Sequence, residues 1–305
     1  MHSAEFSLRE SFSTQHYALS TAMKGMVSMK FDLRETARDH KIIAAHRGCA
    51  GGNIPCNTIP AYEAALMQGA DMIETDLNRT ADGKLIIFHP NMERRHLGRD
   101  VYVNRLPWEE VKQLRYQNYD RTETQFGIIT FDELLETFKG RCYINIDKFW
   151  SHPREIYEAI RAHDMVDQML VKSNVTEEVL RVLEEVAPEL PFMPIVSEEH
   201  PWHEALLKRN VNYVGVEGLY KQDDSYLASP EFMEKMHRDG QLVWGNAIIY
   251  DYLDQLSGGH SDDTALTVSP QYGWGWFADR PFDVILTDWT GMLVGYLKET
   301  GRYYR

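Results

Sequence analysis

The sequence has few cysteines and no long apolar run near its start. Its three cysteines, Cys49, Cys56 and Cys142, are odd in number and form no CxxC pair, which argues against a disulfide framework or a zinc knuckle. Residues 1–41 contain scattered charges and no apolar stretch long enough for a signal-peptide core or a membrane span. We therefore expect a cytoplasmic protein without stable membrane insertion; a secreted protein that has lost its leader is the alternative.

The chain also lacks positive charge. It has 32 Lys and Arg residues against 46 Asp and Glu residues, a formal net charge of −14, and no local cluster of Lys or Arg. The resulting field repels nucleic acids and anionic membranes, so neither is an expected partner. An anionic substrate must then be held by a local cation, either a metal ion or a few basic side chains in a pocket.

Low-complexity segments and internal repeats are absent as well, so neither a linker nor a solenoid is indicated; one domain is favoured, with two smaller domains as the alternative. From residue 42 onward, short continuous apolar runs alternate with helical stretches, as expected for strands that are covered on both faces. A chain of 305 residues suits a single (β/α)₈ TIM barrel with insertions; a doubly wound sheet is the alternative. The nine runs are 42–45, 71–74, 85–88, 142–146, 169–171, 192–196, 211–216, 242–244 and 283–286.

Nine runs are one too many for eight barrel strands, so at least one lies outside the barrel or is not a strand. We expect an N-terminal helical extension over residues 1–40 and a barrel domain over 41–305. Residues 91–127, rich in Arg, Tyr and polar side chains, indicate a small insertion after the third strand-like run.

Ionisable residues recur at the carboxyl ends of the apolar runs. In a parallel barrel those ends meet at one face, where the active site lies. The residues concerned are His46, Arg47, Glu74, Asp76, His89, Asp147 and Lys172.

Three of these residues are carboxylates that suit a metal ion. Glu74 and Asp76 are two apart on one strand, so their side chains leave the same face, and Asp147 ends another strand. Three carboxylates with water favour a hard cation such as Mg²⁺ or Ca²⁺ over zinc. We therefore expect one divalent cation.

The remaining polar residues suggest acid/base chemistry on a phosphate. His46 and His89 can act as general base and general acid, because imidazole changes charge near neutral pH. The Arg47 guanidinium offers a planar fork to phosphate oxygens. Trp244 and Asn246 share a strand face and could contact the substrate alcohol, as could Glu217; a packed core tryptophan and a structural glutamate are the alternatives.

The order of motifs resembles the glycerophosphodiester phosphodiesterase family from about residue 42 to 297. The barrel begins with His46-Arg47-Gly48, followed by Pro55-Cys56-Asn57-Thr58, Glu74-Thr75-Asp76 and Thr80-Ala81-Asp82-Gly83. The C-terminal part is similar to one branch of the family. Its motifs are Trp244-Gly245-Asn246, Gly258-Gly259-His260-Ser261-Asp262-Asp263 and Ile285-Leu286-Thr287-Asp288.

The resemblance implies metal-dependent hydrolysis of small glycerophosphodiesters to an alcohol and glycerol 3-phosphate, through a cyclic phosphate formed by the glycerol hydroxyl. It implies that His46 and His89 are catalytic and that Arg47 and Asn57 bind phosphate or substrate. Of the two histidines, we assign the acid role to His89. The same resemblance makes Glu74, Asp76 and Asp147 the metal ligands.

Four departures from the family pattern affect these expectations. Cys56 replaces a glutamate, Pro90 replaces an aspartate after the second histidine, and Asp147 shortens a glutamate. The family lysine is displaced by one position to Lys148, and a strand residue one position away faces the other side, so Lys148 is expected to be a poor phosphate ligand. We therefore expect Lys172, on the next strand, to supply the positive charge at the phosphate.

Two other functions remain open at this stage. A phosphodiester lyase would stop at the cyclic phosphate, and a non-catalytic barrel would only bind phosphodiesters. The histidine pair and the carboxylates favour catalysis, whereas only Cys56 and Pro90 favour the binding protein. The sequence predicts neither the substrate headgroup nor the oligomeric state.

Overall fold

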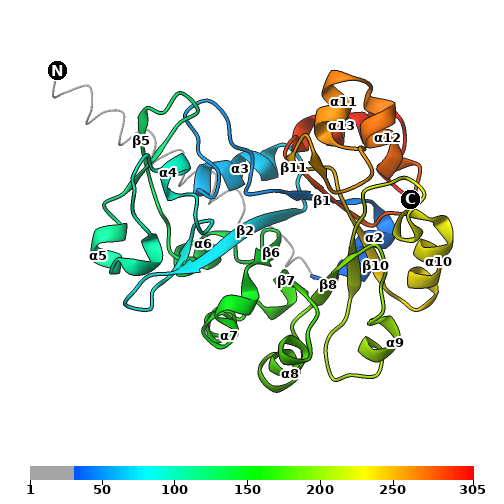
Figure 1. Ribbon diagram of the computed structural model, residues 1–305, viewed down its shortest axis with the longest axis horizontal. Helices are drawn as coiled ribbons and strands as arrows, with labels where there is room; N and C mark the ends of the chain where they lie inside the picture. Colours follow the sequence, from blue (N-terminus) through cyan, green and yellow to red (C-terminus); the bar gives the residue numbers. More distant parts are fainter. Residues whose placement is uncertain (1–30) are drawn as a thin grey trace. The chain divides into compact units, whose positions relative to one another are not determined.

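A closed barrel of eight parallel strands forms the centre of residues 31–305, the part of the chain that the computed structural model describes (Figure 1). The strands are β1 (Ile42–Ala45), β2 (Met72–Arg79), β6 (Tyr143–Asp147), β7 (Met169–Asn174), β8 (Phe192–Ser197), β9 (Gly215–Leu219), β10 (Leu242–Asn246) and β13 (Val284–Thr287). Strand β1 pairs in parallel with both β13 and β2, which closes the ring. The expected TIM barrel is therefore confirmed.

Strand alternation sends every second side chain into the barrel. On β1, Ile42 and Ala44 join an inner cluster, whereas Ile43 packs outward against the helices. The next inward position after Ala44 is His46. The inner cluster also includes Met72, Tyr143, Leu170, Met193, Leu242, Trp244, Val284 and Leu286. Apolar layers thus fill the barrel from its amino end, and polar residues begin near the carboxyl end.

Helices surround the barrel and alternate with its strands. Local signals start them; at Thr130, for example, the side chain accepts from the Glu133 N–H while the Glu133 carboxylate accepts from the Thr130 N–H, a capping box. The barrel helices are α3 (Ile59–Met67), α6 (Phe131–Phe138), α7 (Pro153–Ala162), α8 (Glu177–Val186), α9 (His203–Leu206), α10 (Pro230–Arg238), α11 (Asp262–Thr267), α12 (Pro270–Ala278) and α13 (Thr290–Glu299). Short 3₁₀ turns cover Phe149–Ser151, Val166–Gln168 and Tyr226–Ala228.

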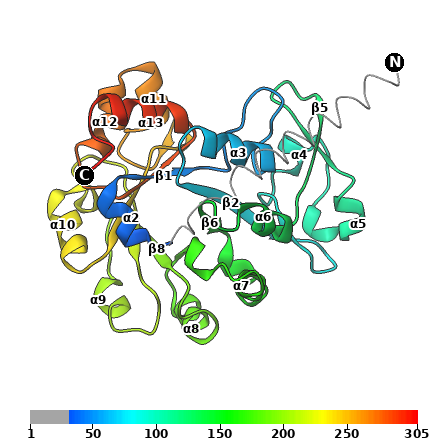
Figure 2. The same ribbon diagram turned by 180° about the vertical axis from the view of Figure 1, so that it is seen from behind.

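Helix α2 (Leu33–Asp39) covers the amino end of the barrel (Figure 2). Its Leu33 and Ala37 join the inner apolar cluster, and the Arg34 guanidinium donates to the carbonyls of Tyr213 and Gly240, which precede β9 and β10. This helix is the last part of the extension expected for residues 1–40. The rest of that extension lies outside the described residues.

The run at residues 85–88 is the one that lies outside the barrel. It forms β3 (Leu85–Ile87), which pairs antiparallel with β2. The expectation that His89 ends a parallel barrel strand is therefore wrong. A tight turn with Gly83 at φ 91° and the Thr80 hydroxyl bonded to Asp82 reverses the chain, so β3 returns towards the carboxyl end of the barrel.

The residues after β3 form a small unit with an apolar cluster of its own. Its elements are α4 (Glu93–His96), a 3₁₀ turn (Val103–Arg105), α5 (Trp108–Val111), β4 (Arg115–Gln117) and β5 (Glu123–Gly127). Phe88, Leu97, Val103, Val111 and Tyr116 pack together there. Figure 1 shows this unit on the opposite side of the barrel from α10 and α12.

One further hairpin, β11 (Ile249–Asp251) with β12 (Asp254–Gln255), follows β10. No helix within residues 31–305 is long and apolar enough to cross a membrane.

Candidate active site

Three carboxylates meet at the carboxyl end of the barrel. The strand register pairs Asp76 on β2 with Asp147 on β6, and Glu74 points inward two residues earlier on β2. One oxygen from each of the three lies within 4.8 Å of the other two. The predicted cluster is thus assembled by two adjacent strands.

The bonds to these carboxylates leave one fully buried oxygen without a hydrogen-bond donor. The backbone N–H of Arg47 donates to Glu74 Oε2 at 2.9 Å. Asp76 Oδ2 accepts from Asn57 Nδ2 at 2.8 Å and lies 2.9 Å from Arg47 Nε. Asp76 Oδ1 is buried and has no hydrogen-bond partner. A buried carboxylate oxygen without a donor costs free energy, which a bound cation would offset.

Electrostatics also indicate that this cluster needs a positive charge. Burial, and then the neighbouring charge of Asp76, raise the pKa of Glu74 to about 7. Burial raises the pKa of Asp147 too, but the Lys148 ammonium outweighs it, and the net shift is downward. The donor set, all carboxylate oxygen, fits a hard divalent cation such as Mg²⁺ or Ca²⁺.

A strained turn after β1 positions the backbone around the cluster. Arg47 and Gly48 have φ values of 56° and 75°, and a Cβ on Gly48 would lie 2.7 Å from the carbonyl carbon of Ala61. Only glycine fits that position, because the turn packs directly on the start of α3. The turn aims the Arg47 N–H at Glu74.

Asn57 supports the cluster from behind. Its Nδ2 donates to Asp76, and its Oδ1 accepts from the Tyr62 hydroxyl at 2.8 Å. The side chain is buried, so both ends of the amide that was predicted to contact substrate are engaged inside the protein.

His46 is held by Asp288, an aspartate that the sequence comparison with the family included in a motif but to which no role was assigned. His46 Nδ1 lies 2.8 Å from Asp288 Oδ1, on the residue after β13. Asp262 in turn accepts from the Asp288 N–H at 2.8 Å and from the Thr287 hydroxyl. Asp288 lies two residues after the inward-facing Leu286, so the strand-end rule applied to the last run would have identified it.

The hairpin of β2 and β3 brings His89 to the carboxylate cluster. The Phe88 N–H donates to the Asp76 carbonyl, and His89 Nε2 lies 3.8 Å from Asp76 Oδ1. His89 Nδ1 lies 2.8 Å from the carbonyl oxygen of Pro90. Because a carbonyl only accepts, Nδ1 carries the hydrogen and Nε2 remains for chemistry. The Pro90 carbonyl thus orients the ring without a carboxylate.

Lys148 and Lys172 do not lie where the sequence predicted. Strand β6 ends at Asp147, and Lys148 takes a left-handed conformation with φ 66°, so the alternation used to turn it away does not apply. Its ammonium contacts Asp147. Lys172 Nζ instead lies 2.8 Å from Glu217 and 3.8 Å from the centre of the Trp244 ring.

Inside the barrel, Lys172 belongs to a network of contacts with Glu217, Trp244 and Asn246. Asn246 Nδ2 donates to Glu217 at 2.9 Å, and Trp244 Nε1 donates to Asn246 Oδ1 at 3.1 Å. Trp244 and Asn246 are fully buried. The alternative of a packed tryptophan agrees with this burial better than a contact with the substrate alcohol.

Cys56 gives no negative charge where the family has a glutamate. Burial raises the pKa of its thiol to about 12, so it stays protonated. Its sulfur lies 3.9 Å from His96 Nδ1 on α4.

The chain has recognisable relatives. The model of the glycerophosphoryl diester phosphodiesterase family matches residues 46–245. Over 144 residues the chain is 33% identical to the glycerophosphodiester phosphodiesterase of Bacillus altitudinis, a match that covers 43% of this chain and 57% of that one. The chain thus spans somewhat more than half the length of that relative.

Two solved structures have the same fold. The glycerophosphoryl diester phosphodiesterase of Parabacteroides distasonis superposes with a TM-score of 0.74 at 16% identity, covering 92% of this chain and 99% of that one. An Oleispira antarctica phosphodiesterase, in complex with its product sn-glycerol-3-phosphate, gives a TM-score of 0.60 at 19% identity, covering 85% and 97%. Because the family model spans more than half of the sequence, and the fold agrees, the chain belongs to the glycerophosphoryl diester phosphodiesterase family, whose members are phosphoric diester hydrolases.

Proposed function

We propose that the chain hydrolyses glycerophosphodiesters to an alcohol and glycerol 3-phosphate with the help of one divalent cation. The observation that carries this proposal is the carboxylate cluster with its unpartnered Asp76 oxygen, beside two histidines that each have one ring nitrogen already bonded. The glycerol 3-phosphate bound to the Oleispira antarctica relative supports the product assignment.

Glu74, Asp76 and Asp147 would hold the cation. When bound, it would supply positive charge that stabilises the phosphoryl oxygens as negative charge develops on them. Arg47, which lies against Asp76, would add a guanidinium to the same oxygens.

The surroundings of the histidines suggest how they divide the proton transfers. Burial lowers the pKa of His46, but its bond to Asp288 and the charge of Glu74 outweigh burial and raise it overall. Burial lowers the pKa of His89, and the charge of Asp76 and the bond to Pro90 only partly oppose this. His46 therefore suits the general acid and His89 the general base, the reverse of the assignment made from the sequence.

In this mechanism His89 Nε2 accepts the proton of the neighbouring glycerol hydroxyl, whose oxygen attacks phosphorus. His46 Nε2 donates a proton to the departing alcohol oxygen. The cyclic phosphate that forms is opened by water in a second step, with the two histidines exchanging roles.

The test is product release from a panel of glycerophosphodiesters after chelation, with Mg²⁺ or Ca²⁺ added back. Phosphorus NMR distinguishes a phosphomonoester from a cyclic phosphate. Glycerol 3-phosphate that appears only with added metal supports the proposal. Accumulation of the cyclic ester would instead identify a lyase, full activity in excess chelator would exclude the metal, and no turnover of any substrate would leave a binding protein.

A further inference from the structure

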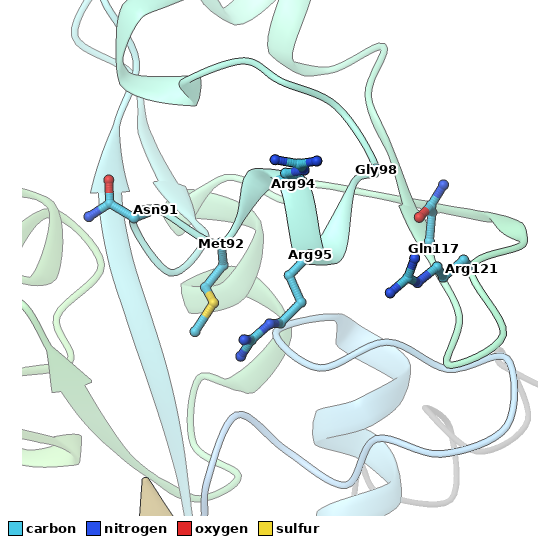
Figure 3. A pocket seen from close by; sticks show the side chains of 7 residues that line it. All are labelled: Asn91, Met92, Arg94, Arg95, Gly98, Gln117 and Arg121. Carbon is cyan, nitrogen blue, oxygen red and sulfur yellow. The ribbon is translucent and has the colours of Figure 1, made fainter. Parts of the chain in front are cut away.

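A polar cavity lies in the unit formed by α4, α5, β4 and β5, which follows His89 in the chain. Its volume is about 650 Å³. Figure 3 shows Arg94 and Arg95 projecting from α4, with Gln117 and Arg121 on the hairpin of β4 and β5. The lining residues are Asn91, Met92, Arg94, Arg95, Gly98, Gln117 and Arg121.

The charge of this cavity is unusual in a chain with a net charge of −14. Across residues 31–305, no acidic side chain forms an ion pair with Arg94, Arg95 or Arg121, and their guanidinium groups make no hydrogen bond. The ion pair of the neighbouring Arg99 with Glu123, at 3.7 Å, is the contrast within the same unit. Three like charges around one cavity repel one another, and an anion placed between them would relieve that repulsion.

A neutral hydrogen-bond donor, the Gln117 amide, also lines the cavity. Gly98 has φ 62°, and a Cβ there would collide with this amide. The glycine therefore leaves room for the Gln117 side chain beside α4. Guanidinium and amide N–H groups together suit an oxyanion such as phosphate.

Short chain connections join this cavity to the candidate active site. Asn91 follows His89 by two residues. Helix α4 ends at His96, whose ring contacts Cys56. Burial and then the positive charges of Arg47 and Arg95 lower the pKa of His96 to about 4. Arg47 of the active site and Arg95 of the cavity thus both act on the same imidazole.

We propose that this cavity binds a second anionic group, carried on the alcohol part of a glycerophosphodiester substrate, of the kind a phosphate monoester provides. The inference rests on the proposed function, because it needs the scissile phosphodiester at Arg47 and the carboxylates. A concave site between two walls suits a small group better than the flat surface of an anionic membrane.

The experiment compares two substrates that differ by one phosphate group, glycerophosphoinositol and glycerophosphoinositol 4-phosphate. The readout is the ratio of their kcat/KM values in the metal-loaded protein. We expect the wild-type protein to favour the phosphorylated substrate by about tenfold or more, a preference that should shrink as salt screens the exposed arginines.

The double variant Arg95→Gln/Arg121→Gln removes one charge from each wall and should bring the ratio close to one, with a much smaller change for glycerophosphoinositol. Arg38→Gln on α2 is the control for a charge removed elsewhere: it removes one positive charge at the other end of the barrel, against two in the double variant. The ratio should not change in this control. A ratio near one in the wild-type protein, or a preference that survives in the double variant, would overturn the proposal.

A binding measurement separates failure of this proposal from failure of the proposed function. Calorimetric titration of both compounds into chelated protein tests the cavity without turnover. Tighter binding of the phosphorylated compound that is lost in the double variant supports the cavity even if neither compound is hydrolysed. Equal binding of both compounds would refute it, and loss of co-sedimentation with phosphatidylglycerol vesicles in the variant, without any substrate preference, would assign the arginines to a membrane surface instead.

Discussion

The two ends of the barrel treat their carboxylates in opposite ways. At the amino end, Asp71 accepts from the Ile43 N–H and pairs with His40 at 2.9 Å. Asp283 likewise accepts from the Val243 N–H and pairs with His237 and Arg305. At the carboxyl end, by contrast, Glu74, Asp76 and Asp147 crowd together, and one of their oxygens has no donor.

The difference shows at which end the protein itself supplies all the partners of its carboxylates. The amino-end carboxylates each have a backbone donor and a cationic partner, so they stabilise the fold without any ligand. The carboxyl-end cluster reaches the same state only with an added cation. Removing a carboxylate should therefore have opposite effects on stability at the two ends.

The largest expected effect comes from Glu74→Gln. The amide can still accept from the Arg47 N–H, but a metal ligand is lost, so activity should fall by at least about 100-fold, since even partners of ligands cost 10- to 100-fold. Assays with metal added back after chelation measure this loss. Asp71→Asn is the control for the amino end and should leave the activity per folded molecule unchanged.

Without metal, the same Glu74→Gln variant should be more stable than the wild-type protein above pH 7. The folded pKa of about 7 lies above the usual 4.5, so the unfolded chain loses this proton first, and stability falls as pH rises between these values. The gain from Gln at pH 8 should approach about 3 kcal/mol. Urea unfolding in the presence of chelator at pH 5 and pH 8 measures this gain. A loss of stability at pH 8 would contradict the expected contrast between the two ends of the barrel.

Next in size are the histidines. His46→Ala or His89→Ala should each lower turnover by about 10²- to 10⁴-fold, and the double variant by much less than the product of the two losses. A p-nitrophenyl leaving group needs little protonation, so it should rescue His46→Ala if His46 is the acid. If this substrate rescues His89→Ala instead, His89 is the acid, as first assigned from the sequence. If it rescues neither variant, the two histidines do not divide the acid and base roles in this way.

The two lysines give a smaller and more diagnostic contrast. Lys148→Met should lower kcat/KM by about tenfold with little change in stability, because Lys148 lies at the rim beside Asp147. Lys172→Met leaves Glu217 buried without its cation and should cost about 3 kcal/mol of unfolding free energy. If Lys172→Met instead weakens substrate binding in a fully stable protein, the sequence-based role for Lys172 at the phosphate stands.

The smallest effect concerns the amino end and its pH dependence. The bond to Asp71 raises the pKa of His40 against the opposing effect of burial. A raised histidine pKa contributes stability below its unfolded value, and this contribution is lost as pH rises through the folded pKa. His40→Gln should therefore cost up to about 1 kcal/mol at pH 5.5 and less at pH 8.5, measured by thermal unfolding. An equal cost at both values would mean that the pair carries no charge.

Much of this architecture could be predicted because it follows from local rules. Continuous apolar runs marked all eight barrel strands, and period-two alternation placed Glu74 and Asp76 on the same inner face. The predictions that were wrong depended on where a strand ends or on the direction in which it pairs. Lys148 was turned the wrong way because β6 ends one residue earlier, and His89 was given to the barrel because an apolar run does not reveal its pairing direction.

Other features required partners distant in the sequence. The bond between His46 and Asp288 joins residues 242 positions apart, and the set of Lys172, Glu217 and Asn246 joins three strands. No periodicity within one segment predicts such pairs. The arginine cavity was missed for a similar reason, since Arg94, Arg95 and Arg121 form no cluster until the hairpin folds against α4.

The bond that the last strand makes to the first histidine has a consequence during synthesis. Asp288 emerges from the ribosome 242 residues after His46, together with the strand that closes the ring against β1. A nascent chain can thus carry every carboxylate of the cluster and still lack an oriented His46. On the proposed mechanism, the chain stays inactive until β13 and Asp288 have been synthesised, and a truncation just before residue 284 would abolish activity without removing any residue of the carboxylate cluster.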